Sequence, residues 1–102
     1  MGYYTVYTLS TDDGMEADYA DELAKISGYG ADHFFEGESC SWYKHHEDMI
    51  ELAQLHPDVT FRLEGVGDEN GDVWVGWYRG DKYKRWELEY SIPEGFDPPG
   101  GW

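Results

Sequence analysis

The sequence predicts an α+β fold, with an antiparallel sheet of about four strands, a C-terminal three-strand meander and two helices on one face. Two patterns in the 102 residues lead to this prediction. Residues 59–92 alternate β-branched or aromatic residues with polar ones between Gly and Asn turns, which is typical of a meander. Residues 15–56 contain two stretches with apolar residues at helical spacing. This order of elements favours helices packed on a sheet.

The meander is expected to consist of strands over residues 59–67, 73–78 and 82–92. A two-residue turn at Gly80-Asp81 places Val75 opposite Trp86 and Trp77 opposite Lys84. Facing residues share a side of the sheet. The apolar face of the last two strands then comprises Val73, Val75, Trp77, Trp86, Leu88, Tyr90 and Ile92.

The turn before residue 73 must deliver Val59, Phe61 and Leu63 to that same apolar face. A three-residue loop at Glu69-Asn70-Gly71 does so, pairing Leu63 with Trp77. Such a hairpin carries a bulge, with its glycine left-handed. A slip by one residue would invert the whole strand. The outer face would then show Trp74, Tyr78, Tyr83, Arg62, Arg85, Glu64 and Glu87.

The first half of the chain is expected to supply one strand and two helices. Tyr3 to Leu9 alternates in strand fashion. The first helix is expected from Met15 to Ser27, after a capping box of Asp13 and Glu16 and before Gly28 as C-terminal glycine. The second helix runs from Trp42 to His56, with Ser41 as a cap. His33 to Phe35 could be a short edge strand or part of an irregular loop.

The chain is predicted to form one domain over residues 1–96, followed by a flexible Pro/Gly tail over residues 97–102. No apolar run approaches the length of a membrane span, and the first residues lack the basic and apolar regions of a signal peptide. Cys40 is the only cysteine, which agrees with a reducing compartment. We therefore expect a soluble protein in the cytoplasm of a host cell.

The formal net charge of −15, from 22 acidic and 7 basic residues, is the most informative property of the composition. Residues 1–58 contribute −11 of it, and residues 59–102 contribute −4. A field of this sign repels nucleic acid and anionic membranes and attracts basic protein surfaces. We therefore expect no direct binding of nucleic acid or membrane.

The acidic residues are densest along the outer side of the first helix and just before it. They predict a surface that binds a basic, nucleic-acid-binding partner. The candidate partner-binding residues of this surface are Asp12, Asp13, Glu16, Asp18, Asp21, Glu22, Asp32, Glu36 and Glu38.

No motif for catalysis or for a cofactor is apparent. Cys40, His45 and His46 are close in sequence, but adjacent histidines on a helix point about 100° apart and rarely hold one ion together. Acidic surroundings would raise the pKa of the Cys40 thiol, against its use as a nucleophile. The sequence therefore predicts neither an enzyme nor a metal or cofactor site.

Two stretches resemble small phage and prophage proteins, mostly of unassigned role. The resemblance lies in Trp42-Tyr43-Lys44-His45-His46-Glu47-Asp48-Met49 and in the run from His56-Pro57-Asp58-Val59 to Gly71-Asp72-Val73-Trp74, with a Tyr-Thr-x-Tyr-Thr-Leu strand at Tyr4 to Leu9. This chain has His45-His46 where that group has a single histidine. The resemblance implies a phage origin. In that setting small acidic proteins often inhibit host defence, including CRISPR effectors, sometimes by imitating DNA.

A second function remains open from the sequence. Trp74 and Tyr78, with Tyr83, would form an aromatic patch on the outer face of the sheet, and such a patch is unusual for a purely solvated surface. The chain could then be an interaction or assembly module, with a homodimer as one form. In this alternative the partner-binding residues are Trp74 and Tyr78, and the acidity only keeps the protein soluble.

Overall fold

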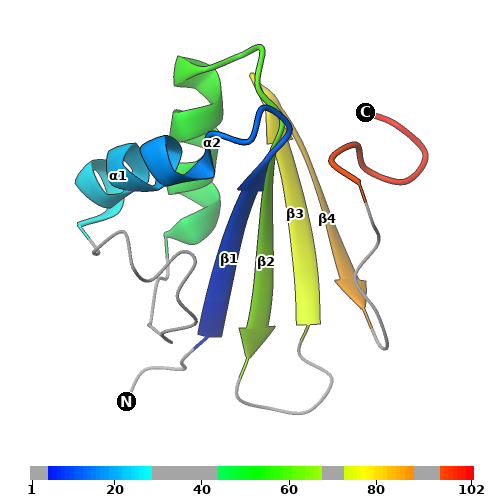
Figure 1. The fold of residues 1–102 in the computed structure, drawn as a ribbon. Helices are drawn as coiled ribbons and strands as arrows, with labels where there is room; N and C mark the ends of the chain where they lie inside the picture. Colours follow the sequence, from blue (N-terminus) through cyan, green and yellow to red (C-terminus); the bar gives the residue numbers. More distant parts are fainter. Residues whose placement is uncertain (1–4, 29–43, 68–72, 89–94) are drawn as a thin grey trace.

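We describe residues 5–28, 44–67, 73–88 and 95–102 from a computed structural model. Within them the chain is α+β, as predicted, and its strands form one antiparallel sheet in the order β1-β2-β3-β4 (Figure 1). The elements are β1 (Thr5–Thr11), α1 (Glu16–Ser27), α2 (His45–Leu55), β2 (Phe61–Gly67), β3 (Val73–Arg79) and β4 (Lys82–Leu88).

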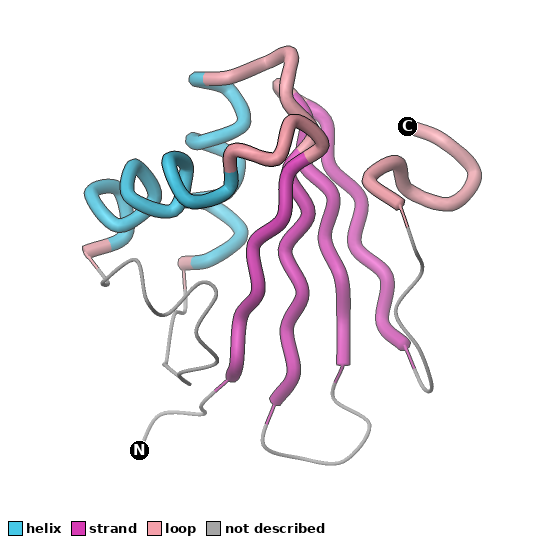
Figure 2. The backbone as a smooth tube through the Cα atoms, viewed as in Figure 1, coloured by secondary structure: helices cyan, strands magenta, loops and turns pink. Residues whose placement is uncertain are grey.

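The two helices cover one face of the sheet, which we call the helix-side face. Figure 2 shows both helices on the same side of the strands. Leu23 of α1 and Met49 and Leu52 of α2 are fully buried at helical spacing. They form one core cluster with strand residues Tyr7, Leu9, Phe61, Leu63, Trp74 and Tyr78.

The β3–β4 hairpin has the predicted pairing. Arg79 lies opposite Lys82, and Val75 lies opposite Trp86, on either side of the Gly80-Asp81 turn. Gly80 has a φ of 58°, which glycine adopts without steric cost and which two-residue hairpin turns require.

The predicted pairing of β2 with β3 is wrong by one residue. Leu63 lies opposite Gly76, not Trp77, and Phe61 lies opposite Tyr78. The described pairs end at Val66 and Val73. The loop residues Glu69, Asn70 and Gly71 themselves lie outside the described residues.

This shift reverses the predicted faces of β3. Trp74 and Tyr78, predicted to be on the outer face, point into the core under the helices, where they are 4% and 0% exposed. Tyr83 and Arg85 share their side, because Tyr83 pairs with Tyr78 and Arg85 with Gly76. Arg62 and Glu64 lie on the opposite face, which we call the far face.

Strand β3 is buried on both sides. On the far face Val75 and Trp77 are fully buried, although neither belongs to the core cluster beneath the helices. Figure 1 draws residues 95–102 on the other side of the strands from the helices. Pro98 in this segment is buried, and the Gly101 N–H donates to the Pro98 carbonyl over 3.0 Å.

The helix ends agree with the sequence in part. Gly28 ends α1 with a φ of 84°, and its N–H donates to the Ala24 carbonyl. The predicted capping box is absent, because Met15 is the N-cap and makes no side-chain cap bond. Asp13 instead accepts the Met15 backbone N–H over 3.1 Å. No helix within the described ranges is long and apolar enough to cross a membrane.

Some predictions fall on residues outside the described ranges. They are the short edge strand at His33 to Phe35, the cap Ser41 with Trp42 and Tyr43, and the apolar residues Tyr90 and Ile92 of the last strand.

Candidate functional site

The Asp13 carboxylate, in the turn between β1 and α1, accepts three hydrogen bonds. Its Oδ1 accepts hydrogen bonds from the Thr11 hydroxyl over 2.7 Å and from the Met15 N–H over 3.1 Å. Its Oδ2 accepts the Tyr19 hydroxyl over 2.8 Å. Both oxygens of Asp13 therefore hold the first turn of α1 against the end of β1.

These bonds change the acidity of both partners. Burial alone would raise the pKa of Asp13, but the hydrogen bonds from Thr11, Met15 and Tyr19 outweigh it and leave the Asp13 pKa lowered. The hydrogen bond to Asp13 is the largest cause that raises the pKa of Tyr19 to about 12. At neutral pH the pair is therefore a carboxylate with a neutral phenol.

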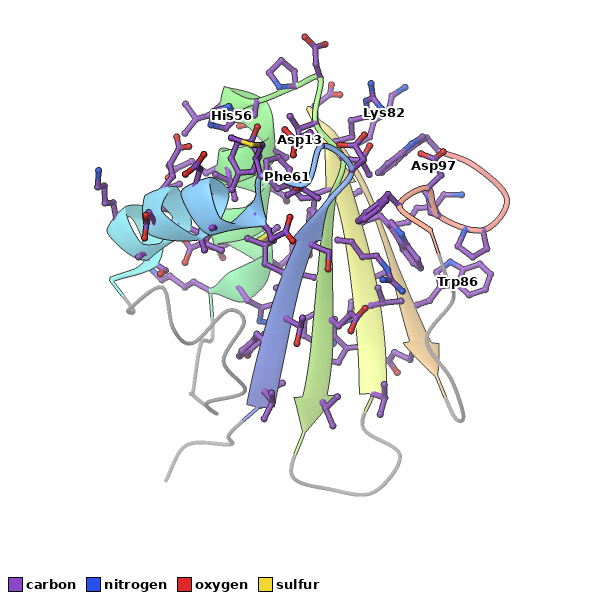
Figure 3. All side chains as sticks on the ribbon, in the orientation of Figure 1. Asp13, His56, Phe61, Lys82, Trp86 and Asp97 are labelled. Atoms are coloured by element: carbon purple, nitrogen blue, oxygen red, sulfur yellow. The ribbon has the colours of Figure 1, made fainter. Side chains whose placement is uncertain are left out.

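A second link joins α1 to the end of α2. His56 Nε2 lies 2.6 Å from Glu22 Oε2, and both side chains are about one-third exposed. The His56 ring also packs edge-on against Tyr19, with centroids 4.9 Å apart, and Tyr19 packs against Phe61 at the same distance. Figure 3 shows Asp13, His56 and Phe61 close together where the helices meet the sheet.

Asp12 ties the β1–α1 turn to the start of β2. Its Oδ1 accepts the Thr60 N–H over 3.1 Å, while its own N–H donates to the Thr60 carbonyl. The fully buried Thr60 hydroxyl accepts a hydrogen bond from Arg79 over 3.1 Å. This end of the molecule is therefore a connected polar network and not a loose acidic surface.

The structure divides the predicted acidic residues into three groups. Asp12, Asp13 and Glu22 are engaged in the network above. Asp18 and Asp21 are exposed on α1, and Glu16 is half-buried at 3.5 Å from the Thr11 hydroxyl. Asp32, Glu36 and Glu38 lie outside the described residues.

The side chains of Asp18 and Asp21 form no hydrogen bond or ion pair with any residue in the described part of the chain. They are three positions apart on α1, so their side chains are neighbours on its surface. Residues 5–28 carry six acidic residues and only Lys25 as a cation.

The predicted aromatic patch on the outer face is wrong, because Trp74 and Tyr78 are buried. Trp74 stacks on His45, with ring centroids 4.9 Å apart. The Tyr78 hydroxyl forms a hydrogen bond with His46 Nδ1 over 3.0 Å. Both rings are buried beneath the start of α2, so neither is available to a partner.

The histidines at the start of α2 contact aromatic rings. His46 packs edge-on against Tyr83, and the Arg85 guanidinium lies 4.3 Å above the Trp74 ring and 3.2 Å from His45 Nε2. Among the described residues no group of three His, Cys, Asp or Glu is placed to hold a metal ion. Cys40 lies outside those ranges, and the absence of a metal or cofactor site remains a prediction.

Sequence reasoning missed a cationic-aromatic surface on the outer strand β4. We define it as Lys82, Tyr83, Lys84, Arg85 and Trp86. Tyr83 and Trp86 are 51% and 41% exposed. The signal was available, because residues 79–86 hold four of the chain's seven cations and only one acidic residue. The net charge of −4 over residues 59–102 does not reveal this cationic stretch.

Comparison of the chain with protein-family models, with curated proteins and with solved structures finds no match.

Proposed function

We propose that this chain is a non-enzymatic inhibitor that binds a basic, nucleic-acid-binding surface of a host defence protein, such as a CRISPR effector, through the outer side of α1. The observation that carries the proposal is that the side chains of Asp18 and Asp21 are exposed and form no ion pair with a cation in the described part of the chain. Like charges at neighbouring helix positions repel by a few tenths of a kcal/mol. A cationic partner removes that repulsion. The resemblance to small phage proteins supports the choice of target.

The surface is also held rigidly. Asp13 fixes the first turn of α1 to β1, and Glu22 fixes its middle to His56 at the end of α2. Carboxylates on an ordered helix lose little conformational freedom on binding, which favours affinity. Two of the nine predicted acidic contacts thus contribute by holding the surface in place. Contact itself would centre on Asp18 and Asp21.

The proposal is tested by capture of nucleic-acid-binding proteins from a nuclease-treated bacterial lysate on the immobilised chain. We expect capture to weaken steeply with salt and to be displaced by added double-stranded DNA, because the two compete for the same basic groove. The double variant Asp18→Lys, Asp21→Lys should lose most of the captured protein.

A matched control separates the site from net charge. Asp58→Lys with Asp81→Lys raises the net charge by the same amount, at two exposed turn positions outside α1. This control should retain capture. If both double variants lose capture equally, only overall charge matters and the proposed surface is wrong. If neither loses it, α1 is not the contact.

A further inference from the structure

The chain carries two exposed surfaces of opposite charge on opposite sides of the molecule. Figure 3 shows Lys82 and Trp86 on the side of the sheet away from the helices. Residues 79–86 have a formal charge of +3, within a protein of −15. On the other side, residues 5–28 have a formal charge of −5.

The cationic-aromatic surface has the composition of a protein-binding site. Aromatic residues and arginine are enriched at the centres of protein interfaces, and exposed tryptophan is uncommon elsewhere on a surface. Lys82 and Lys84 form no ion pair with a described residue. Arg85 is held in place by Trp74 and His45. Its neighbours Tyr83 and Trp86 project to opposite sides of β4, so the surface wraps around the outer strand of the sheet.

We infer that this surface binds a second copy of the chain, by contacting the outer side of α1 in that copy. The side chains of Lys82 and Lys84 form no ion pair within the described ranges, and neither do those of Asp18 and Asp21. The chain therefore supplies both halves of a complementary pair. Because the two halves are different surfaces, the contact is head-to-tail and generates rings or open chains, not a two-fold dimer.

The net charge of −15 opposes this association at long range. At about 0.15 M salt the Debye length is about 8 Å, so repulsion between whole molecules is largely screened while charges in contact still attract. Tyr83 and Trp86 add apolar area that salt does not weaken. Self-association also covers α1, so it would compete with the basic partner proposed above, although it does not depend on that partner.

Sedimentation velocity tests the inference over protein concentrations from about 5 to 500 μM, the range of weak protein association. At about 0.15 M salt the average mass of the parent chain should rise with concentration. The variant Lys82→Glu, Lys84→Glu should associate at least about tenfold more weakly. The control variant Lys25→Glu, Lys44→Glu has the same net charge as the β4 variant but leaves β4 intact. It should associate about as strongly as the parent chain.

The decisive experiment mixes two variants that have complementary intact surfaces. Lys82→Glu, Lys84→Glu keeps an intact α1 surface, and Asp18→Lys, Asp21→Lys keeps an intact β4 surface. Each should associate at least about tenfold more weakly than the parent when alone, and the mixture should form a complex, because the parental contact between α1 and β4 is restored. Circular dichroism and thermal unfolding first establish that both variants are folded.

Three outcomes would overturn the inference. The first is a parent chain that stays monomeric throughout the concentration range. The second is a mixture of the two variants that forms no complex. The third is a monomeric parent chain that binds a labelled oligothymidylate through Lys82 and Lys84, which would make the surface a nucleic-acid site.

Discussion

The indole of Trp74 lies where the Cβ of any residue other than glycine would stand at position 65. Gly65 and Trp74 face each other across β2 and β3. A similar relation holds within β3, where a Cβ on Gly76 would lie 2.9 Å from Tyr78 Cε2. Two glycines thus make room on the helix-side face for the two large rings of the core.

Replacement of Gly65 by alanine should lower the free energy of unfolding by about 1–3 kcal/mol, because the new methyl group must displace a buried indole. Urea denaturation followed by tyrosine and tryptophan fluorescence measures this change. In a Trp74→Leu background the same substitution should cost less, since leucine leaves space above position 65. Equal costs in the two backgrounds would show that the indole does not constrain this site.

Trp77 should be as important for stability as a residue beneath the helices. It is fully buried on the far face, whereas Trp86 on the same face is 41% exposed. We expect Trp77→Ala to cost about 3–5 kcal/mol, as for large buried aromatics. Trp86→Ala should cost about 1 kcal/mol or less. If Trp77→Ala is as mild as Trp86→Ala, the far face does not form a packed layer.

The burial of β3 on both sides explains which part of the fold the sequence predicted and which part it did not. The β3–β4 pairing follows from Gly80-Asp81, because a two-residue turn permits only one register. The β2–β3 pairing depended on hydrophobic alternation. Val75 and Trp77 alternate with Trp74 and Tyr78, so either face of β3 could be chosen as the core. The usable signal was Gly65 and Gly76, which are small where large rings must fit.

The candidate site was predictable to a similar extent. Helical spacing alone places Asp18 and Asp21 on the outer side of α1. The roles of Asp13 and Glu22 could not be inferred in this way. Glu22 contacts His56, which is 34 residues away in sequence, and Asp13 accepts from a tyrosine on the next turn. The Glu22 contact depends on how α1 packs against the end of α2, which local patterns do not determine.

The Asp13–Tyr19 hydrogen bond predicts a titration at high pH. The folded pKa of Tyr19 is about 12, above an unfolded value of about 10. The stabilisation is therefore fully present below pH of about 10 and is lost as the pH rises through about 12. Asp13→Asn should bring the Tyr19 pKa back toward its ordinary value, as followed by NMR of ¹³C-labelled tyrosine. Tyr78, whose pKa is raised mainly by burial, provides the internal control and should not respond.

Asp13 makes the corresponding contribution at low pH. Its pKa is lowered in the folded chain, so its stabilisation is present above the unfolded value of about 3.9 and is lost as the pH falls through the folded value. The difference in unfolding free energy between parent and Asp13→Asn should therefore shrink on acidification. A difference that stays constant from neutral to acidic pH would contradict this role for Asp13.

Replacement of Glu22 should mainly lower stability, whereas replacement of Asp18 and Asp21 together should mainly weaken binding. All three are carboxylates on one helix. Glu22→Gln removes the charge that faces His56, and since both side chains are one-third exposed we expect a loss of about 0.3–1 kcal/mol. A double-mutant cycle with His56→Gln measures the coupling, which should fall with added salt.

Asp18→Asn with Asp21→Asn should change the unfolding free energy by no more than about 0.5 kcal/mol, because lost repulsion offsets lost interaction with the helix dipole. That pair should nevertheless weaken capture of the basic partner far more than Glu22→Gln does. If Glu22→Gln weakens capture as much as the Asp18 and Asp21 pair does, at unchanged stability, Glu22 is itself a contact residue and the division of the acidic surface is wrong.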